Sequence, residues 1–290
     1  MTKSRDDLRT GIGLRLPHLA VVAATRPTAN WLEIHPENFL ANPHARELLE
    51  EIADHYAISV HTVGVSIGSA GGIDAAHLKR VRALVDRLDP VLVSGHLAWS
   101  THKGAYLNDL LPLPYNEQVL DLLVRHVGEV QDGLGRRYLV ENPSTYVGIR
   151  GSIMTEPEFL GELAQRTGCG LLCDVSNIHV SGTNLGFDPV AYLEAFPAEQ
   201  VAEMHLGGYT PEADPADPGA ELLIDTHAAP IADPAWRLYA RAVARFGATP
   251  TLIEWDSALP PFATLQNEAA KADTLAAAVL GWEVRHARAG

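Results

Sequence analysis

The feature that most limits the fold of this 290-residue chain is a short apolar run that ends in a metal-binding side chain and recurs along the sequence. Such runs end in His61, His96, Glu141, Asp174, His205 and Glu254. One buried acid or imidazole is more often a hydrogen-bonded core residue than a ligand. Six at equivalent places need a common means of neutralising charge, because charged groups are rarely buried without a partner. A metal cluster is the simplest explanation.

The apolar runs predict eight strands. They span Gly11 to Leu16, Trp31 to His35, Ile58 to Val63, Val91 to Leu97, Tyr138 to Asn142, Leu171 to Val175, Val201 to Leu206 and Thr251 to Trp255. Most are continuously apolar rather than alternating, as expected of parallel strands that are covered on both faces. Pro143 follows the fifth run and has no N–H to donate to a sheet, so Glu141 lies at the exit of its strand.

Helix-like segments separate these runs. The clearest span His44 to Tyr56, Ala75 to Leu88, Asn116 to Leu134, Glu158 to Thr167 and Asp233 to Phe246. Eight strands alternating with helices predict an α/β fold, a single (β/α)8 TIM-like barrel over residues 1–290, and such barrels have roughly 250 residues. Active sites of these barrels lie at the C-terminal ends of the strands, where the six donors fall. Topology and chemistry predict the same place for the site.

Two connections and the last segment are longer than the fold requires. Ala98 to Tyr115 follows the fourth strand, and Gly207 to Pro230 follows the seventh. Loops of this length in a compact domain are often functional, so we expect both to cover a substrate. The final segment, from about Ala263 to Arg288, is expected to form a helix that either packs on the barrel or serves as a partner surface.

Further donors lie beyond the strand ends. Asp225 and His227 are two residues apart, so in an extended segment they share a face and could bind one metal together. Asn177 could offer an amide oxygen, or its amide could bond to backbone in a turn. Asp256 could bind metal, move protons beside it or cap the next turn. Mixed nitrogen and oxygen donors without thiolate suit iron, manganese or zinc in a cluster of roughly two or three ions.

Charge and cysteine content limit the partners and the compartment. The formal net charge of -14 argues against a nucleic-acid partner, because a phosphate backbone binds basic surfaces. The two cysteines, Cys169 and Cys173, are not spaced as C-x-x-C, which predicts structural thiols in a reduced cytoplasm. The charged start does not resemble a signal peptide, and no apolar run approaches the ~18 residues of a membrane span, so we expect a cytoplasmic protein with no membrane partner.

One motif points to a different chemistry. Residues 64–68 match the G-x-S-x-G pattern, in which Ser66 would be a hydrolase nucleophile. That elbow opens directly into a helix, whereas residues 69–72 read Ser-Ala-Gly-Gly. We therefore expect the glycines to let the chain pass close to the site or a ligand rather than to present a nucleophile.

Ordered blocks of this sequence resemble the multinuclear non-haem iron-dependent oxidase family, whose best-known member acts in methanobactin biosynthesis. The blocks are residues 11–18, 31–38, 61–69, 94–100, 111–115, 141–144, 174–177, 205–208, 225–227 and 254–256, which together span nearly the whole chain. The resemblance implies a TIM-like barrel that modifies a ribosomally made precursor peptide, often at cysteine. It also implies a small partner protein that presents the peptide.

The same resemblance implies roughly two or three iron ions in mixed Fe(II) and Fe(III) states, with O2 as co-substrate. One iron would be held by His61, His96 and Glu141. Glu141 would bridge to a second iron that is held also by Asp174, His205 and Glu254, and a third would be held by Asn177, Asp225 and His227. Asp256 resembles the acidic group proposed to move protons, so we expect Asp256 and Glu141 to be the catalytic residues.

Two other function classes stay open. A metal-dependent isomerase or phosphodiesterase, like the xylose isomerase and endonuclease IV group, would also gather His, Glu and Asp at strand ends, but would work without O2. A non-catalytic metal- or peptide-binding scaffold would bind metal without turnover. The chain departs from the resembled family at Thr62, Leu185 and Trp255, and these departures bear on the shape of the pocket rather than on the donors.

Overall fold

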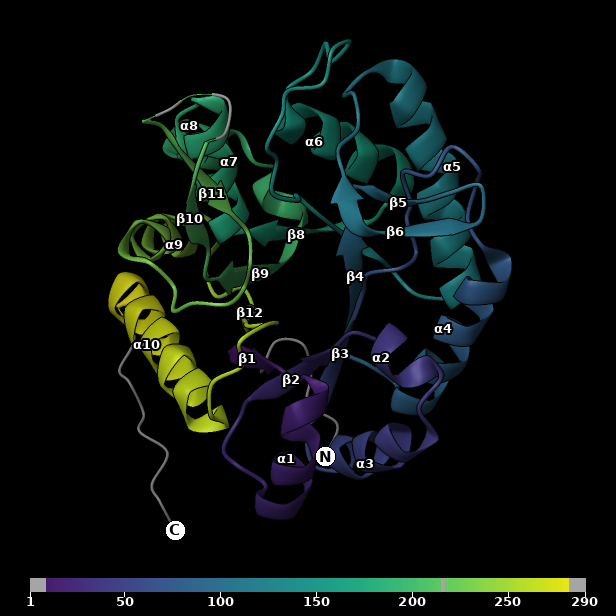
Figure 1. The fold of residues 1–290 in the computed structure, drawn as a ribbon, viewed down its shortest axis with the longest axis vertical. Helices are drawn as coiled ribbons and strands as arrows, with labels where there is room; N and C mark the ends of the chain where they lie inside the picture. The colour runs from purple at the N-terminus through teal and green to yellow at the C-terminus, as the bar shows by residue number, and fades with distance from the viewer. Residues whose placement is uncertain (1–8, 215–216, 218, 282–290) are drawn as a thin grey trace.

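The computed structural model describes residues 9–281, except 215, 216 and 218. Its barrel strands are β1 (Thr10–Gly13), β2 (Trp31–Ile34), β3 (Ala57–Thr62), β4 (Leu92–His96), β7 (Leu139–Glu141), β8 (Gly170–Asp174), β9 (Val201–Gly207) and β12 (Thr251–Glu254). They are all parallel and close in the order β1-β12-β9-β8-β7-β4-β3-β2 (Figure 1). The predicted barrel is confirmed, and each predicted run overlaps one strand.

Helices surround this barrel (Figure 1). They are α1 (Leu19–Thr25), α2 (Glu37–Leu40), α3 (Pro43–Ala53), α4 (Ala75–Leu88), α5 (Glu117–Leu134), α6 (Glu156–Thr167), α7 (Val175–Leu185), α8 (Pro189–Ala195), α9 (Asp233–Phe246) and α10 (Phe262–Leu280), with 3-10 turns at Leu16–His18 and Ala198–Gln200. The five predicted helices correspond to α3, α4, α5, α6 and α9. The predicted last helix corresponds to α10, which packs against β1, β12 and α9. Its predicted end, residues 282–288, lies outside the described residues, and the single domain over residues 1–290 stays a prediction.

Side chains inside the barrel change from apolar to polar along the strands. At the N-terminal end, Trp31, Leu92, Leu139, Leu172, Ala202 and Leu252 form their own buried cluster. Successive residues of a strand point to opposite faces, so the next inward position lies two residues further on. At five of these strands the residue two positions further on is polar. These residues are Glu33 after Trp31, Ser94 after Leu92, Glu141 after Leu139, Asp174 after Leu172 and Glu254 after Leu252. The period of the strands therefore gathers carboxylates at the C-terminal end of the barrel interior.

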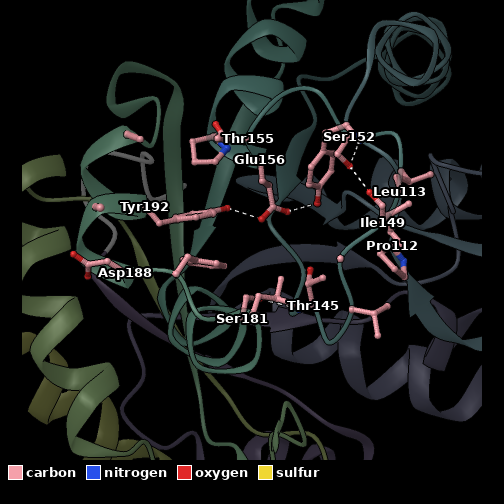
Figure 2. Close-up of a pocket in the computed structure, with 18 residues that line it drawn as sticks. Pro112, Leu113, Thr145, Ile149, Ser152, Thr155, Glu156, Ser181, Asp188 and Tyr192 are labelled. Carbon is pink, nitrogen blue, oxygen red and sulfur yellow. Dashed lines mark hydrogen bonds between the residues drawn. The ribbon is translucent and has the colours of Figure 1, made fainter. Parts of the chain in front are cut away.

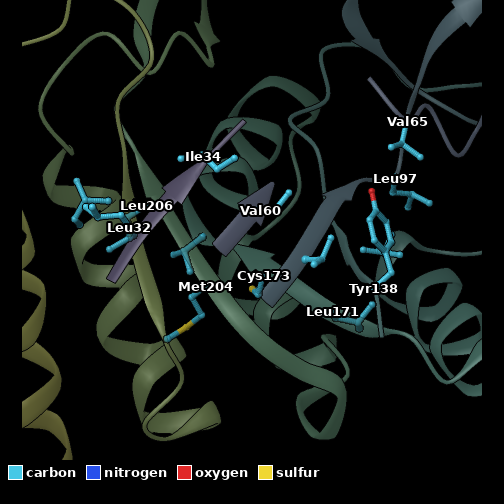
Figure 3. Packing of buried hydrophobic residues seen from close by; sticks show 14 of the residues in the cluster. Leu32, Ile34, Val60, Val65, Leu97, Tyr138, Leu171, Cys173, Met204 and Leu206 are labelled. Atoms are coloured by element: carbon cyan, nitrogen blue, oxygen red, sulfur yellow. The ribbon is translucent and has the colours of Figure 1, made fainter. Parts of the chain in front are cut away.

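The outward-facing side chains of the same strands pack beneath the helices. Figure 3 shows Leu32, Ile34, Val60, Leu171, Cys173, Met204 and Leu206 in this larger cluster. Burying one side chain of this size stabilises the fold by about 1.5–3 kcal/mol. The main core is thus the layer between sheet and helices, and this layer holds the strands in register while the upper interior is left to polar groups.

The two long connections form β-hairpins. The segment after β4 contains β5 (Trp99–His102) paired antiparallel with β6 (Ala105–Leu111), and the segment after β9 contains β10 (Thr210–Ala213) paired antiparallel with β11 (Glu221–Ile224). Both hairpins follow C-terminal ends of barrel strands. They therefore lie at the end of the barrel where the predicted site is, and their role in covering a substrate stays a prediction.

The two cysteines are buried and unpaired. Burial raises the pKa of Cys169, and burial with the nearby Asp174 and Glu141 charges raises that of Cys173 well above the ordinary value, which disfavours a reactive thiolate at either position. They behave as the predicted structural thiols. Among the described residues, no helix combines the length and the apolar character needed to cross a membrane.

Candidate metal centre

The predicted donors converge at the C-terminal end of the barrel. His61 lies on β3, His96 ends β4, Glu141 ends β7, Asp174 ends β8, His205 lies on β9 and Glu254 ends β12. Neighbouring strands bring donors directly opposite one another: His96 pairs with Glu141, and Asp174 pairs with His205. The parallel register of the sheet therefore sets the geometry of these six donors.

His61, His96 and Glu141 form the first group. The Glu141 Oε2 atom lies 3.2 Å from His61 Nε2 and 3.4 Å from His96 Nε2, and the two Nε2 atoms are 3.1 Å apart. On its far side, His61 Nδ1 contacts the Ser94 hydroxyl at 2.7 Å, which fixes the orientation of the ring. A single cation could be bound by all three side chains, since their facing atoms lie within 4.8 Å of one another.

Glu141, Asp174 and His205 form a second group that shares Glu141 with the first. The His205 Nδ1 atom also lies 3.1 Å from Glu254 Oε2. Asp174 caps α7, because its Oδ1 atom accepts a hydrogen bond from Asn177 N–H at 2.7 Å, and this contact leaves Oδ2 free to face the group. The residues predicted to hold the second metal are therefore together.

His227 and Asp225 form the third group with Glu254. The His227 Nε2 atom lies 2.7 Å from Asp225 Oδ1, and His227 Nδ1 lies 3.5 Å from Glu254 Oε2. His227 has a φ of 45°, and a Cβ on Gly207 would lie 2.5 Å from its ring. Only a glycine at position 207 leaves room for the imidazole where it lies.

Asn177 lies in the first turn of α7, beside Glu141. Its Nδ2 donates to Glu141 Oε1 at 3.4 Å and to the Asn142 carbonyl at 3.2 Å, while its Oδ1 atom has no hydrogen-bond partner among the described residues. Both interpretations of Asn177, as a metal ligand and as an amide bonded to backbone, are therefore compatible with the structure. The amide binds backbone, and its oxygen remains available.

Several buried donor atoms have no hydrogen-bond partner within the described part of the chain. Among the proposed ligands they are Glu141 Oε2, Asp174 Oδ2, Asn177 Oδ1, His205 Nε2, Asp225 Oδ1 and His227 Nε2. Asp225 Oδ1 and His227 Nε2 are close, yet they do not have hydrogen-bond geometry. Leaving a buried polar group unsatisfied costs about 1–3 kcal/mol each. A set of oxygen and nitrogen atoms that face one another without bonding fits bound cations better than it fits a metal-free site.

Burial holds part of the centre in uncharged states. Burial, with repulsion by His96 and His205, lowers the pKa of His61 well below its usual value, and burial lowers that of His96 to about 4. Both imidazoles are therefore neutral at pH 7, the form that binds metal. Burial and the Asp225 charge raise the pKa of Asp174 to about 7, and burial raises that of Glu141 well above its usual value.

The other two imidazoles shift in the opposite direction. Although burial opposes it, the Glu33 charge, the nearby Glu203 carboxylate and the hydrogen bond with Glu254 raise the pKa of His205. Asp225 and Glu254 do the same for His227, again against burial. In the absence of metal, protons on these two rings would balance the carboxylates. A bound cation would replace those protons, so metal binding should release protons from the site.

Arg15 is a buried cation that the sequence analysis did not place here. Its Nη2 donates to Glu254 Oε1 at 3.0 Å, and its Nε donates to Asp256 Oδ1. Asp256 Oδ2 lies 3.4 Å from His227 Nδ1. Although burial opposes it, Arg15 lowers the pKa of Asp256, which is therefore ionised at neutral pH. The sequence offered one indication of this buried cation, since Arg15 interrupts the apolar run of residues 11–16.

Three more polar residues of the barrel interior were missed. His35 follows β2, and its Nε2 lies 3.5 Å from Glu254 Oε1. Glu33 and Glu203 are both 0% exposed, and their Oε1 atoms lie 3.5 and 3.7 Å from His205 Nε2. Burial and the Glu33 charge raise the pKa of Glu203 to about 8. Each glutamate lies two residues before a histidine, and residues two apart in an extended chain share a face, so this spacing was the signal available in the sequence.

The G-x-S-x-G motif is structural. The Ser66 Oγ atom accepts hydrogen bonds from the N–H groups of Ser100 and Thr101, at 2.8 and 3.1 Å, and so holds β5 in place. The next helix, α4, begins only at Ala75. The strand–turn–helix arrangement of a hydrolase elbow is therefore not formed around Ser66, as expected.

The positions that depart from the resembled family have separate surroundings. The Thr62 hydroxyl donates to the Ser94 carbonyl and contacts the Tyr138 hydroxyl at 2.6 Å, on the outward side of β3. Trp255 is buried, and Leu185 lines a cavity beside α7. Of Thr62, Leu185 and Trp255, Leu185 alone lines this cavity and so affects its shape.

Comparison with known proteins gives a family and a fold. Residues 9–277 match the profile of the RiPP precursor modification enzymes MbnB/TglH/ChrH. A UPF0276 protein of Vibrio vulnificus is 49% identical over 271 residues, which covers 93% of this chain and 92% of that protein. A UPF0276 protein of Paraburkholderia phytofirmans is 46% identical over 281 residues and covers 96% and 91%.

Among solved structures, a xylose isomerase-like TIM barrel protein of Mycobacterium smegmatis, in complex with magnesium, has a TM-score of 0.61 at 15% identity, covering 96% of this chain and 100% of that one. A D-psicose 3-epimerase of Clostridium cellulolyticum has a TM-score of 0.55 at 12% identity and covers 94% and 99%. At such low identity these structures show a shared fold alone.

Proposed function

Because the chain belongs to the MbnB/TglH/ChrH family, whose enzymes modify the precursors of ribosomally synthesised and post-translationally modified peptides, we propose that it is a multinuclear non-haem iron oxidase that uses O2 to modify a precursor peptide at cysteine. This is the peptide-modifying family that the motifs predicted. The observation that carries the iron proposal is the set of buried, unpartnered oxygen and nitrogen atoms that face one another at the end of the barrel.

We propose three metal positions. His61, His96 and Glu141 would hold the first, and Glu141 with Asp174, His205 and Glu254 the second. Asp225 and His227 would hold the third together with Asn177, whose side chain contacts Glu141. Iron bound there would supply the redox chemistry with O2 that amino-acid side chains lack. Carboxylate and imidazole donors without thiolate suit iron and also suit manganese and zinc, so dioxygen dependence must decide.

The chain's own groups position the substrate and move protons. The side chains of His96, Asp225 and His227 are 12–15% exposed, whereas those of Glu141 and His205 are 2% and 0% exposed. A peptide side chain would therefore approach from the side of His96 and His227, while the deeper groups stay away from water. Asp256, kept ionised by Arg15, would take up a proton at Oδ2 beside His227 Nδ1.

We also propose the partners and the compartment. A ribosomally made precursor peptide would be the substrate, and a small partner protein would present it at the end of the barrel flanked by the β5–β6 and β10–β11 hairpins. The buried, unpaired cysteines support the reducing cytoplasm as the place where the protein works. The formal net charge of -14 favours a peptide over a nucleic acid as the ligand.

The test is anaerobic loading with Fe(II), followed by O2 and the peptide encoded by a short cysteine-bearing reading frame beside the gene. We expect mass spectrometry to show an O2-dependent mass change at cysteine with the wild type and with Glu162→Gln. Glu162 is a half-exposed residue of α6, and its variant is the matched control for Glu141→Gln, which should give no product.

Two other outcomes would replace the proposal. Turnover without O2, supported by zinc, manganese or magnesium, would identify a metal-dependent isomerase or phosphodiesterase of the xylose isomerase kind. Bound metal with no change in the peptide under O2 would identify a scaffold.

A further inference from the structure

A cavity of about 500 Å³ lies beside the metal centre, between α6, α7 and α8 (Figure 2). Its walls come from three segments: residues 112–115 after β6, residues 145–157 between β7 and the start of α6, and residues 181–195 of α7 and α8. Most of the lining side chains are apolar, and two of them, Val147 and Leu185, are 57% and 39% exposed. A cavity of this size with exposed apolar residues at its edge is typical of a ligand site.

Two carboxylates line the cavity: Asp188, which is exposed and caps α8, and Glu156, which lies among the apolar walls. Glu156 accepts hydrogen bonds from the Tyr115 hydroxyl at Oε1 and from the Tyr192 hydroxyl at Oε2, both at 2.7 Å (Figure 2). A carboxylate has about four lone-pair positions, so each oxygen keeps an acceptor position. No lysine, arginine or histidine of the described residues lies within 4.0 Å of it in an ion pair. The cavity therefore holds a negative group without a cation.

The surroundings of Glu156 act in opposite directions. Burial raises the pKa of Glu156, and the two phenolic hydrogen bonds oppose this rise without cancelling it, so the pKa stays above its usual value. Glu156 also lies in the first turn of α6, where the helix dipole favours a negative charge. A cation that entered the cavity would remove the cost of burial, so the site is complementary to a positive charge carried on an apolar stem.

One face of α7 contributes residues both to the cavity and to the metal centre. Asn177, Ser181 and Leu185 are spaced four residues apart and so lie on one face of this helix. At 1.5 Å per residue, Ser181 lies about 6 Å and Leu185 about 12 Å along the axis from Asn177. Asn177 contacts Glu141, and Ser181 accepts a hydrogen bond from Thr145 N–H at 2.9 Å, so the same helix face lines both sites.

We propose that this cavity binds a lysine or arginine side chain of the substrate peptide, with its charged head paired to Glu156 and its stem on the apolar walls. This proposal rests on the proposed function for the identity of the ligand as a peptide. An extended peptide spans about 3.3–3.6 Å per residue, so a basic residue two to four positions from the reacting residue would reach the cavity. The formal net charge of -14 favours such a basic peptide.

The experiment measures binding of two short peptides to the full chain by calorimetry. Acetyl-Leu-Lys-Leu-amide carries the charge, and acetyl-Leu-norleucine-Leu-amide has nearly the same shape without it. We expect the lysine peptide to bind the wild type at least about tenfold more tightly, because a partly buried charge pair contributes at least that much. In Glu156→Gln the amide oxygen still accepts from one tyrosine hydroxyl and the amide NH2 donates to the other, so the shape is kept while the charge is removed. This variant should lose the preference, whereas Glu162→Gln on the same helix should retain it.

A second pair of variants tests the place of binding. Ala191 is exposed on α8 and lines the cavity, so Ala191→Trp should fill it and weaken both peptides. Glu194→Trp, on the same helix but outside the lining, is its control. Equal affinity for both peptides, a preference that survives in Glu156→Gln, or unchanged binding to Ala191→Trp would each overturn the proposal. If Glu156→Gln does not fold, the tryptophan pair decides alone.

The peptide measurement needs no iron, O2 or turnover. A failed oxidase assay would therefore leave a positive binding result unchanged, and a failed binding assay would leave an oxidase result unchanged. The oxidase proposal and the cavity proposal can therefore be refuted independently of each other.

Discussion

Replacing Asp174 by asparagine should stabilise the metal-free protein at pH 8, although it removes a proposed ligand. Asp174 is 0% exposed, and its Oδ2 atom has no hydrogen-bond partner among the described residues. Its Oδ1 atom caps α7, and asparagine caps a helix about as well as aspartate does. The substitution therefore removes a buried charge and keeps the local structure.

The size of the effect follows from the pKa. Burial and the Asp225 charge raise the pKa of Asp174 from 3.8 to about 7. Between these values the unfolded chain has lost this proton while the folded chain still holds it, so the free energy of unfolding falls as the pH rises through this range. The loss is absent below about pH 4 and complete above about pH 7, where it amounts to about 4 kcal/mol at 1.36 kcal/mol per pKa unit.

Asp174→Asn has no carboxyl group to ionise, so its free energy of unfolding does not fall in this way. The difference in unfolding free energy between Asp174→Asn and the wild type should therefore grow by about 4 kcal/mol from pH 4 to pH 8. A buried amide N–H without a partner adds a constant cost of about 1–3 kcal/mol, which leaves the pH dependence unchanged and still gives a net gain at pH 8.

Urea unfolding of chelator-treated protein, followed by far-ultraviolet circular dichroism, measures this difference across the pH range. The matched control is Asp188→Asn, because Asp188 is an exposed residue that caps α8 through Val190 N–H at 2.9 Å. Because its carboxylate is exposed to water, this variant tests the loss of a capping carboxylate without the removal of a buried charge. A difference between Asp174→Asn and the wild type that is flat with pH would refute the reasoning. Added Fe(II) should stabilise the wild type more than the Asp174 variant, because ligand binding favours the state that binds.

Three further substitutions test other parts of the site. Arg15→Met leaves two carboxylates without their buried cation and should lower the free energy of unfolding by about 3–5 kcal/mol in urea titrations, whereas a loss below about 1 kcal/mol would contradict the assigned pairing. Gly207→Ala should displace His227 and lower the metal content measured by elemental analysis, and full metal content would show that the ring is not a ligand. Ser66→Ala should reduce stability by about 1–3 kcal/mol and leave turnover intact, and abolished turnover in a folded variant would return Ser66 to the mechanism.

The barrel could be predicted because its strands are buried on both faces. Runs such as Val91 to Leu97 and Leu171 to Val175 are apolar throughout, which is typical of parallel strands, and Pro143 marked the end of β7 directly. The helix limits at Ala75 and Leu88 agree with α4, whose N-cap Asp74 accepts hydrogen bonds from two backbone N–H groups. The residues at the ends of these strands and of α4 were therefore sufficient to predict where each element begins or ends.

α7 could not be predicted in the same way. It begins immediately after Asp174, with no connecting loop, and its first turn carries buried polar residues, Ser176 and Asn177. Its apolar pattern is therefore interrupted on the face that the centre uses. The short α8 and the two hairpins were likewise missed, because their positions depend on packing against elements that are distant in the sequence.

The deep carboxylates were missed for a related reason. Charged residues are usually exposed, so Glu33 and Glu203 within apolar runs did not stand out as members of a site. Their inward direction follows only when the strand period is counted from His35 and His205. Candidate ligands at strand ends could be recognised from the sequence, whereas the groups that orient them required the closed barrel.

The most direct test of this account is elemental analysis of the full chain purified without oxygen and supplied with Fe(II). The account predicts roughly two or three iron ions per chain, with fewer in Glu141→Gln, because that carboxylate belongs to two of the three groups. Less than one ion per chain, or a content that is unchanged by the loss of Glu141, would contradict it.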